Sequence, residues 1–142
     1  MKPQKTIKTE GSISGKGLFT GRDGKLVFCP AAPDTGIVFI RTDVAEQLRI
    51  KADIGNVAQR GRRTSLKKGS VSIETVEHCL AAVNAMEIDN LIIKLDGPEV
   101  PGGDCSSAVF CRTLKKCGFQ EQQKPRSEFV INEPVTVSQG DS

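Results

Sequence analysis

The segment from Ser72 to Met86, SIETVEHCLAAVNAM, combines a helical apolar stripe with an opposite face of unusually small residues. At helical spacing, Val76, Leu80 and Val83 fall on one side, which predicts a helix packed against a core. Ser72 is expected to cap the start of this helix. The other side carries mostly alanine, where a solvated helix would carry Lys, Glu and Gln. The pattern therefore predicts a helix that packs on its own core and is approached by a second body of protein on the other side.

Glu77 and His78 lie on the small-residue side of this predicted helix, and His78 is the only histidine in the chain. Neighbouring residues on a helix diverge by about 100°, so the two side chains would hold separate positions around one site. An imidazole nitrogen can ligate a metal ion while a carboxylate acts as general base on a metal-bound water. The alternative, favoured while only these two residues are considered, is a partly buried histidine satisfied by an ordinary hydrogen bond.

The composition of the chain narrows the class of protein. Its 142 residues suit one domain with an adequate core, and 20 basic against 17 acidic residues give a net charge of only +3. That balance, without an aromatic-rich basic pattern, argues against nucleic-acid binding. Five cysteines without CxxC spacing argue against a disulfide framework or a structural zinc site and favour free thiols in a reducing cytosol. Since no signal peptide or membrane-spanning run is recognisable, a cytoplasmic protein is expected.

The densest cationic cluster of the sequence is formed by Arg60, Arg62 and Arg63. A solvated loop is the simpler interpretation and is slightly favoured, because surface loops commonly carry such charges. Contact with a phosphate-bearing ligand is the alternative, since guanidinium groups bind phosphate through paired hydrogen bonds.

Alternating β-rich runs separated by turn residues predict the rest of the fold. Strands are expected within 6–21, 25–29, 37–41, 50–57, 64–73 and 88–96, with 25–29 and 37–41 forming an antiparallel pair. The apolar run at 88–96 should be central in the sheet. A second helix is predicted from about 106 to 117, ended by Gly118 at a positive φ. These elements predict an α+β fold, a two-layer sandwich of mostly antiparallel sheet with two helices on one face.

The last part of the sequence predicts a domain boundary. Residues 121–127 are polar and are expected to form a linker, and 128–137, EFVINEPVTV, are expected to begin a new strand. That strand either returns to the first sheet or starts another domain. We assign residues 1–123 to one α+β domain and 124–142 to a linker and the first strand of a truncated second domain.

Several segments occur together in an order that is similar to one known enzyme family. They are GKGLFTG at 15–21, PAAPDTGIVFIRTD at 30–43, RTSL at 63–66, TVEH at 75–78, GPEVPGGDCSSAVF at 97–110 and CGFQEQ at 117–122. Nearly the whole chain resembles the N-terminal half of UDP-3-O-acyl-N-acetylglucosamine deacetylase, a zinc amidase of lipid A biosynthesis. The resemblance implies two similar α+β domains packed face to face, with the zinc site between their helical layers.

The resemblance also implies roles for individual residues. His78 would be a zinc ligand and Glu77 the general base, while the remaining Zn²⁺ ligands would come from a C-terminal domain that this sequence does not contain. The implied substrate-binding positions are Leu18, Phe19, Thr20, Arg63 and Thr64. The substrate would be a nucleotide-sugar lipid whose N-acetyl group is hydrolysed, so the 142 residues alone should be inactive. No nucleic-acid partner and no transmembrane segment are expected, and a transient contact with a membrane surface is left open.

Two residues depart from the family pattern. Phe19 stands where the family usually has the histidine of L-H-T-G, so a polar contact from that position would be lost. Cys105 stands where a glycine is usual, and this position is expected to need a positive φ that cysteine disfavours. Both departures concern the handling of the substrate more than the fold.

The second functional hypothesis belongs to a different class. A stand-alone, non-catalytic domain could bind a partner or a nucleotide-sugar through the alanine-rich helix face and the arginines at 60–63. A ribosomal or kinase-associated domain of the same two-layer topology is a weaker analogy, because it rests on the fold alone.

Overall fold

A five-stranded mixed sheet forms the centre of the computed structural model, which describes residues 2–140. Across this sheet the strands follow the order β2 (Gly11–Lys16), β3 (Asp23–Pro30), β9 (Leu91–Leu95), β4 (Ile37–Arg41) and β5 (Arg49–Lys51). Three of the four pairings are antiparallel, and only β4 and β9 run parallel. The predicted mostly antiparallel sheet is therefore confirmed, with β9 at its centre as expected.

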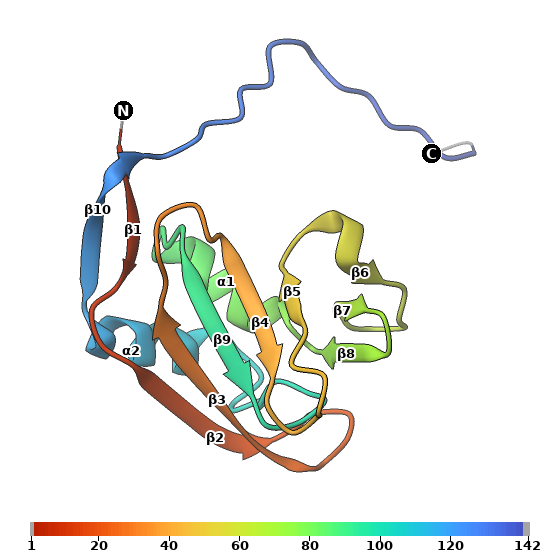
Figure 1. Cartoon of the computed structure of the whole chain (residues 1–142). Helices are drawn as coiled ribbons and strands as arrows, with labels where there is room; N and C mark the ends of the chain where they lie inside the picture. Colours follow the sequence, from red (N-terminus) through yellow and green to blue (C-terminus); the bar gives the residue numbers. More distant parts are fainter. Residues whose placement is uncertain (1, 141–142) are drawn as a thin grey trace.

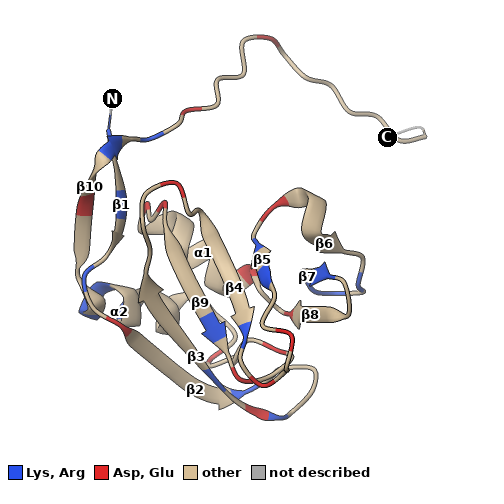
Figure 2. Ribbon diagram, in the orientation of Figure 1, with Lys and Arg blue, Asp and Glu red and all other residues tan. Residues whose placement is uncertain are grey.

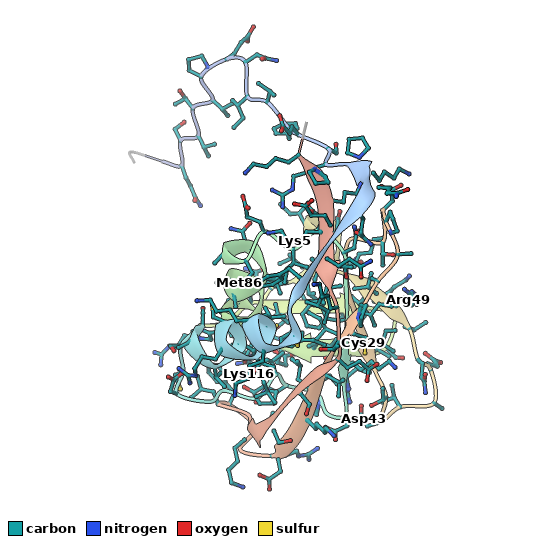
Figure 3. The ribbon with its side chains drawn as sticks, turned by 90° about the vertical axis from the view of Figure 1, so that its left-hand side faces the viewer. Lys5, Cys29, Asp43, Arg49, Met86 and Lys116 are labelled. Carbon is teal, nitrogen blue, oxygen red and sulfur yellow. The ribbon has the colours of Figure 1, made fainter. Side chains whose placement is uncertain are left out.

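Two helices, α1 (Glu77–Ala85) and α2 (Ala108–Cys117), cover one face of this sheet (Figure 1). Figure 3, turned by 90°, shows both helices on the same side of the strands. Each helix contributes three buried side chains to the layer between helices and sheet: Cys79, Ala82 and Val83 from α1, and Phe110, Leu114 and Cys117 from α2. The arrangement confirms the predicted α+β class with two helices on one face.

The core is built on one continuous row of side chains that crosses four strands. Phe28 on β3 pairs with Ile93 on β9, Ile93 pairs with Phe39 on β4, and Phe39 pairs with Ile50 on β5. All four are completely buried. Because strand side chains alternate between faces, every second residue of these strands points at the helices. Burying each such side chain contributes about 1.5–3 kcal/mol, so the row anchors both layers.

Two smaller sheets flank the central one. β1 (Pro3–Ile7) pairs with β10 (Phe119–Pro125) at one end. At the other end lie β6 (Val57–Ala58), β7 (Ser65–Lys68) and β8 (Val71–Glu74), preceded by a 3₁₀ turn at Ile54–Asn56. The predicted pair of short strands within 64–73 is confirmed as β7 and β8, and β8 leads into α1.

A buried polar network ties the β1–β10 sheet to the central sheet. The side-chain amide of Asn90 donates to Oε1 of Gln4 at 2.8 Å and to Oε1 of Gln122 at 2.7 Å. Its own oxygen accepts the backbone N–H of Gly36 at 2.9 Å. Asn90 is only 1% exposed, and no buried side-chain polar atom within residues 2–140 lacks a partner. A satisfied network of this kind specifies how the termini of the domain join its core.

The expected pairing of 25–29 with 37–41 is wrong, because β9 is inserted between β3 and β4. Alternation marks both segments as strands but carries no information on which strand lies beside which. The predicted linker at 121–127 is also wrong in its first part, since β10 continues to Pro125 and pairs with β1. Its polar side chains fit a peripheral strand: five of its seven residues are exposed and the other two are half-buried.

The predicted helix at 72–86 begins later than expected. Ser72 belongs to β8, where it pairs with Lys67, so it does not cap a helix. α1 starts at Glu77, and Val76 at its N-cap makes no side-chain cap hydrogen bond. Ala82, assigned from the sequence to the outer face, is buried, whereas Ala81 and Ala85 are exposed.

Residues 126–139 carry no helix or strand, and Figure 1 shows this segment running away from the body of the domain. The strand expected at 128–137 is therefore absent from the described chain. Its apolar side chains stand in solvent, and those exposed by 63–93% are Phe129, Val130, Ile131, Val135 and Val137. Nothing in the described residues 2–140 pairs with this segment in a sheet.

Candidate active site

The chain turns from β8 into α1 at Thr75, and this turn brings Glu77 and His78 to the first positions of the helix. Thr75 has a φ of 60°, a conformation that β-branched residues rarely adopt. Its hydroxyl donates to Oε1 of Glu99 at 2.8 Å, and the residue is 1% exposed. Backbone strain of this kind persists only where surrounding contacts hold it, and it is common at functional sites.

Glu77 is oriented by the segment that precedes β7. Its Oε2 atom accepts the backbone N–H of Thr64 at 3.0 Å, while a carboxylate in the first turn is also favoured by the helix dipole. Glu77 and His78 are both half-buried, so neither is sealed in the core. Among residues 2–140, no protein group hydrogen-bonds Oε1 of Glu77 or the imidazole of His78. One carboxylate oxygen and one imidazole are therefore available at the start of α1.

Glu99 joins the loop after β2 to the turn before α1. Its carboxylate accepts the backbone N–H of Phe19 at 2.9 Å and of Thr20 at 2.7 Å, in addition to the Thr75 hydroxyl. A Cβ at Gly17 would lie 2.3 Å from Glu99 Oε2, so only glycine allows the loop to approach this closely. Burial would raise the pKa of Glu99, but the N–H groups of Phe19 and Thr20 outweigh it and hold that pKa below its ordinary value.

Glu74 is a second buried carboxylate beside the site. It accepts the Nε–H of Arg63 at 2.7 Å and the hydroxyl of Ser65 at 2.5 Å, and Arg60 Nε lies 3.5 Å away. The guanidinium of Arg63 also lies over the ring of Phe19, 4.5 Å from its centroid. Burial would raise the pKa of Glu74, but Ser65 and Arg63 outweigh it and lower that pKa. Arg63 is therefore fixed between an aromatic face and a carboxylate.

These contacts bring together most of the positions implied by the resemblance. Thr64 bonds Glu77, Arg63 covers Phe19, and Phe19 and Thr20 are tied through Glu99 to the residue that begins the turn into α1. Leu18 lies in the same loop and is 53% exposed. The sequence reasoning overlooked Glu74 and Glu99 as site residues. A glutamate between two prolines in the loop 97–104 was the one local signal for Glu99.

The described residues do not form a complete metal centre by themselves. A cleft of about 450 Å³ lies elsewhere and is lined by residues that include Arg49, Lys51 and Lys68. Within residues 2–140, no group of three or more His, Cys, Asp or Glu could hold a metal ion. Neither of the two α-helices found in residues 2–140 has the length and apolar character of a membrane-spanning helix.

Comparison with known proteins matches nearly the whole chain to one enzyme family. The family model described as LpxC, UDP-3-O-acyl N-acetylglycosamine deacetylase, matches residues 4–142. The chain is 41% identical to the UDP-3-O-acyl-N-acetylglucosamine deacetylases of Bdellovibrio bacteriovorus and Myxococcus xanthus, over 97% of its own length and 46% and 44% of theirs. It is 39% identical to the bifunctional enzyme LpxC/FabZ of Porphyromonas gingivalis, over 31% of that protein. The chain thus spans less than half the length of these relatives.

Proposed function

Because the chain belongs to the UDP-3-O-acyl N-acetylglycosamine deacetylase family, we propose that it forms the N-terminal half of a deacetylase that hydrolyses the N-acetyl group of UDP-3-O-acyl-N-acetylglucosamine. The observation that carries the proposal is the start of α1. There a carboxylate with one free oxygen and an accessible imidazole follow each other in the first turn of the helix, directly after the strained turn at Thr75. This pair supplies a base and a metal ligand, the two groups that amide hydrolysis by a metal-dependent enzyme requires.

His78 is proposed as one ligand of a catalytic Zn²⁺. The donor set fits this role in part, since the imidazole is accessible and unbonded within residues 2–140, but it is one ligand where a catalytic zinc site needs three. The remaining ligands would come from the part of the relatives that this chain does not match. When bound, zinc would polarise the acetamide carbonyl and make a water more acidic.

Glu77 is proposed as the general base. Its Oε1 atom would take a proton from the attacking water, while the Thr64 N–H on Oε2 keeps the carboxylate at a fixed angle. Because Oε2 is already engaged, the proton is received at a defined atom. The same carboxyl group can then return the proton to the glucosamine nitrogen as the amide bond breaks and acetate leaves.

We further propose that the loop 18–20, with Arg63 and Thr64, contacts the substrate. Phe19 is 44% exposed, and the guanidinium of Arg63 packs against its ring. The substrate would therefore meet an apolar aromatic ring with a positive charge next to it. The side chain of Phe19 cannot make a polar contact with the substrate, but the charged guanidinium of Arg63 lies next to its ring. Glu99 would keep the loop in place while the substrate binds.

The segment 124–142 is proposed to lead into a second domain that completes the site. Lys124 and Pro125 still belong to β10, and the exposed apolar residues beyond them require burial against further protein. The same domain would cover the exposed alanines of α1 and supply the missing zinc ligands. On this proposal the 142 residues alone are inactive.

Two measurements test the proposed function. Zinc titration of the 142-residue chain should show at most weak binding, which His78→Ala abolishes, and tight stoichiometric binding would show that no second half is needed. In a chain extended to the length of the relatives, His78→Ala should empty the metal site. Glu77→Gln should keep the metal but slow hydrolysis by about 10²–10⁴-fold. Unchanged turnover in Glu77→Gln, with the exposed Glu121→Gln as control, would refute the role of Glu77.

A further inference from the structure

A cleft of about 450 Å³ opens on the side of the central sheet that the helices leave uncovered. Arg49 and Lys51 on β5 line this cleft, and they flank Ile50, which is completely buried in the core. Because side chains alternate along a strand, both cations point away from α1 and α2. Figure 3 shows Arg49 on the side of the sheet opposite to both helices. The cleft is therefore separate from Glu77 and His78 at the start of α1.

Three cationic side chains line this cleft together. Lys68 on β7 joins Arg49 and Lys51, and its Nζ atom donates to the backbone oxygen of Arg49 at 3.3 Å. Figure 2 shows the basic residues of β5 and β7 in blue. All three side chains belong to exposed residues, and within residues 2–140 none of them forms an ion pair with a carboxylate. Like charges that line one cleft without a counter-ion repel one another, so an anion that neutralises them would be bound favourably.

The two carboxylates that line the cleft have other partners. Oδ1 of Asp34 accepts the side-chain N–H of Gln4 at 2.7 Å, and its Oδ2 accepts the ammonium of Lys124. The hydrogen bonds from Gln4 and Lys124 hold the pKa of Asp34 below its ordinary value. Oδ1 of Asp53 accepts the backbone N–H of Gly55 at 2.7 Å and so caps the 3₁₀ turn. Since neither carboxylate is paired with the three cations, the cleft keeps a positive charge.

The remaining groups of the cleft indicate the kind of anion that fits. Thr35 contributes a hydroxyl and Asn56 a side-chain amide, whereas Val38 is the one aliphatic side chain among the lining residues. The amide of Asn56 donates to the backbone oxygen of Lys51 at 3.0 Å, which fixes it beside that cation. Small-molecule sites of about 300–1,000 Å³ are usually lined by apolar side chains, but this cleft is polar. A phosphate group has several acceptor oxygens and up to two negative charges, which match these donors.

We propose that this cleft is a second binding site of the domain and takes the phosphate group of a phosphate-bearing molecule. Arg49, Lys51 and Lys68 supply the positive charge, and Thr35 supplies a neutral donor. The bound phosphate would join β5 of the central sheet to β7 of the smaller sheet, since it contacts cations from both. A dissolved phosphate and the phosphate headgroup of a lipid share this chemistry. The site needs neither zinc nor the hydrolysis proposed above, so each proposal can fail without the other.

Titration of the 142-residue chain with inorganic phosphate, at an ionic strength kept constant with sodium chloride, tests the proposal. The amide chemical shifts of Thr35, Lys51 and Asn56 should change and reach saturation. Lys51→Met should weaken phosphate binding by at least about 5-fold, because a charge-assisted hydrogen bond is lost. Lys67→Met is the matched control, since Lys67 is exposed, carries the same charge and points to the other face of β7 from Lys68. It should weaken binding by less than about 2-fold, as expected for a screened surface charge.

Thr35→Val separates an organised site from general charge attraction. This substitution changes no charge, so non-specific attraction predicts an unchanged affinity for phosphate. The proposed site predicts binding that is weaker by about 2–10-fold, because one neutral hydrogen bond is lost. Thr35→Ser keeps the hydroxyl and should bind phosphate as the wild type does.

Co-sedimentation with vesicles distinguishes the two sources of the phosphate. The vesicles consist of phosphatidylcholine, with or without phosphatidic acid, whose headgroup is a phosphate monoester. Retention that requires both phosphatidic acid and Lys51 would identify a lipid headgroup as the ligand. Phosphate binding without retention on either vesicle would identify a dissolved phosphate compound. Equal losses in Lys51→Met and Lys67→Met, unchanged affinity in Thr35→Val, or phosphate-induced shifts confined to residues 60–65 would overturn the proposal.

Discussion

Replacing Glu99 by glutamine should loosen the candidate active site and destabilise the domain. Glu99 is 3% exposed, and its two carboxylate oxygens accept N–H groups of Phe19 and Thr20 and the hydroxyl of Thr75. Glutamine keeps the shape but places an NH₂ group opposite one of these N–H donors. The remaining bonds also change from charged to neutral acceptors. Hydrogen bonds to buried charged groups contribute roughly 1.5–3 kcal/mol each, so Glu99→Gln should cost about 3 kcal/mol.

The pH dependence of this cost gives a second, independent check. The pKa of Glu99 lies below its ordinary value of 4.5 in the folded chain. A carboxyl group with a lowered folded pKa contributes stability that is fully present above its unfolded pKa and is lost as the pH falls through the folded one. The difference between wild type and Glu99→Gln should therefore be largest near neutral pH and shrink below about pH 4.5.

Urea unfolding followed by circular dichroism at several pH values measures both quantities, with the exposed Glu121→Gln as control. Amide hydrogen exchange at Phe19 and Thr20 reports whether the loop is released locally. Unfolding free energies within about 0.5 kcal/mol of wild type, together with unchanged exchange at both amides, would refute the role assigned to Glu99. A difference that does not change with pH would refute the role of its charge.

Three further substitutions probe residues away from Glu99 and the loop 18–20 that it holds. Cys105 is exposed and has a φ of 61°, which glycine adopts at no steric cost, so Cys105→Gly should raise the free energy of unfolding by about 0.5–1 kcal/mol. A melting temperature no higher than that of the wild type would contradict this prediction. Asn90→Leu should lower the free energy of unfolding by at least about 3 kcal/mol, because three buried hydrogen bonds lose their shared partner. Denaturant midpoints close to that of the wild type would show that this network is not important for stability. The chain should self-associate through its exposed apolar C-terminal residues, so Phe129→Ser should reduce the light-scattering mass at high concentration; a clean wild-type monomer would count against this.

The local features of the fold could be predicted from the sequence. The apolar spacing before Gly118 predicted α2, and the glycine indeed has a positive φ of 67°. The positive φ at Cys105 was expected because the family that the sequence resembles usually has glycine at this position. The short apolar run at 88–96 marked the central strand, observed at Leu91–Leu95, because a strand buried among others shows fewer polar residues than one at an edge. In each case residues within a few positions decide the conformation.

Strand neighbours and the limits of α1 could not be predicted in this way. The insertion of β9 between β3 and β4 is settled by contacts more than 50 residues apart in the chain, for which alternation gives no signal. Helix propensity alone allowed α1 to begin at Ser72, but pairing with β7 draws residues 71–74 into a strand. Tertiary pairing overrides local propensity where the two compete.

By itself, the sequence showed that Glu77 and His78, the proposed base and metal ligand, are neighbours within a helix that packs on the core. Only the tertiary structure showed what holds them there. Glu99 and Glu74 look like ordinary acidic residues in the sequence, and their importance depends on which groups they meet: backbone amides from one loop and arginines from another. A buried charge acquires its role from the partners that folding brings to it, and these are not its neighbours in the sequence.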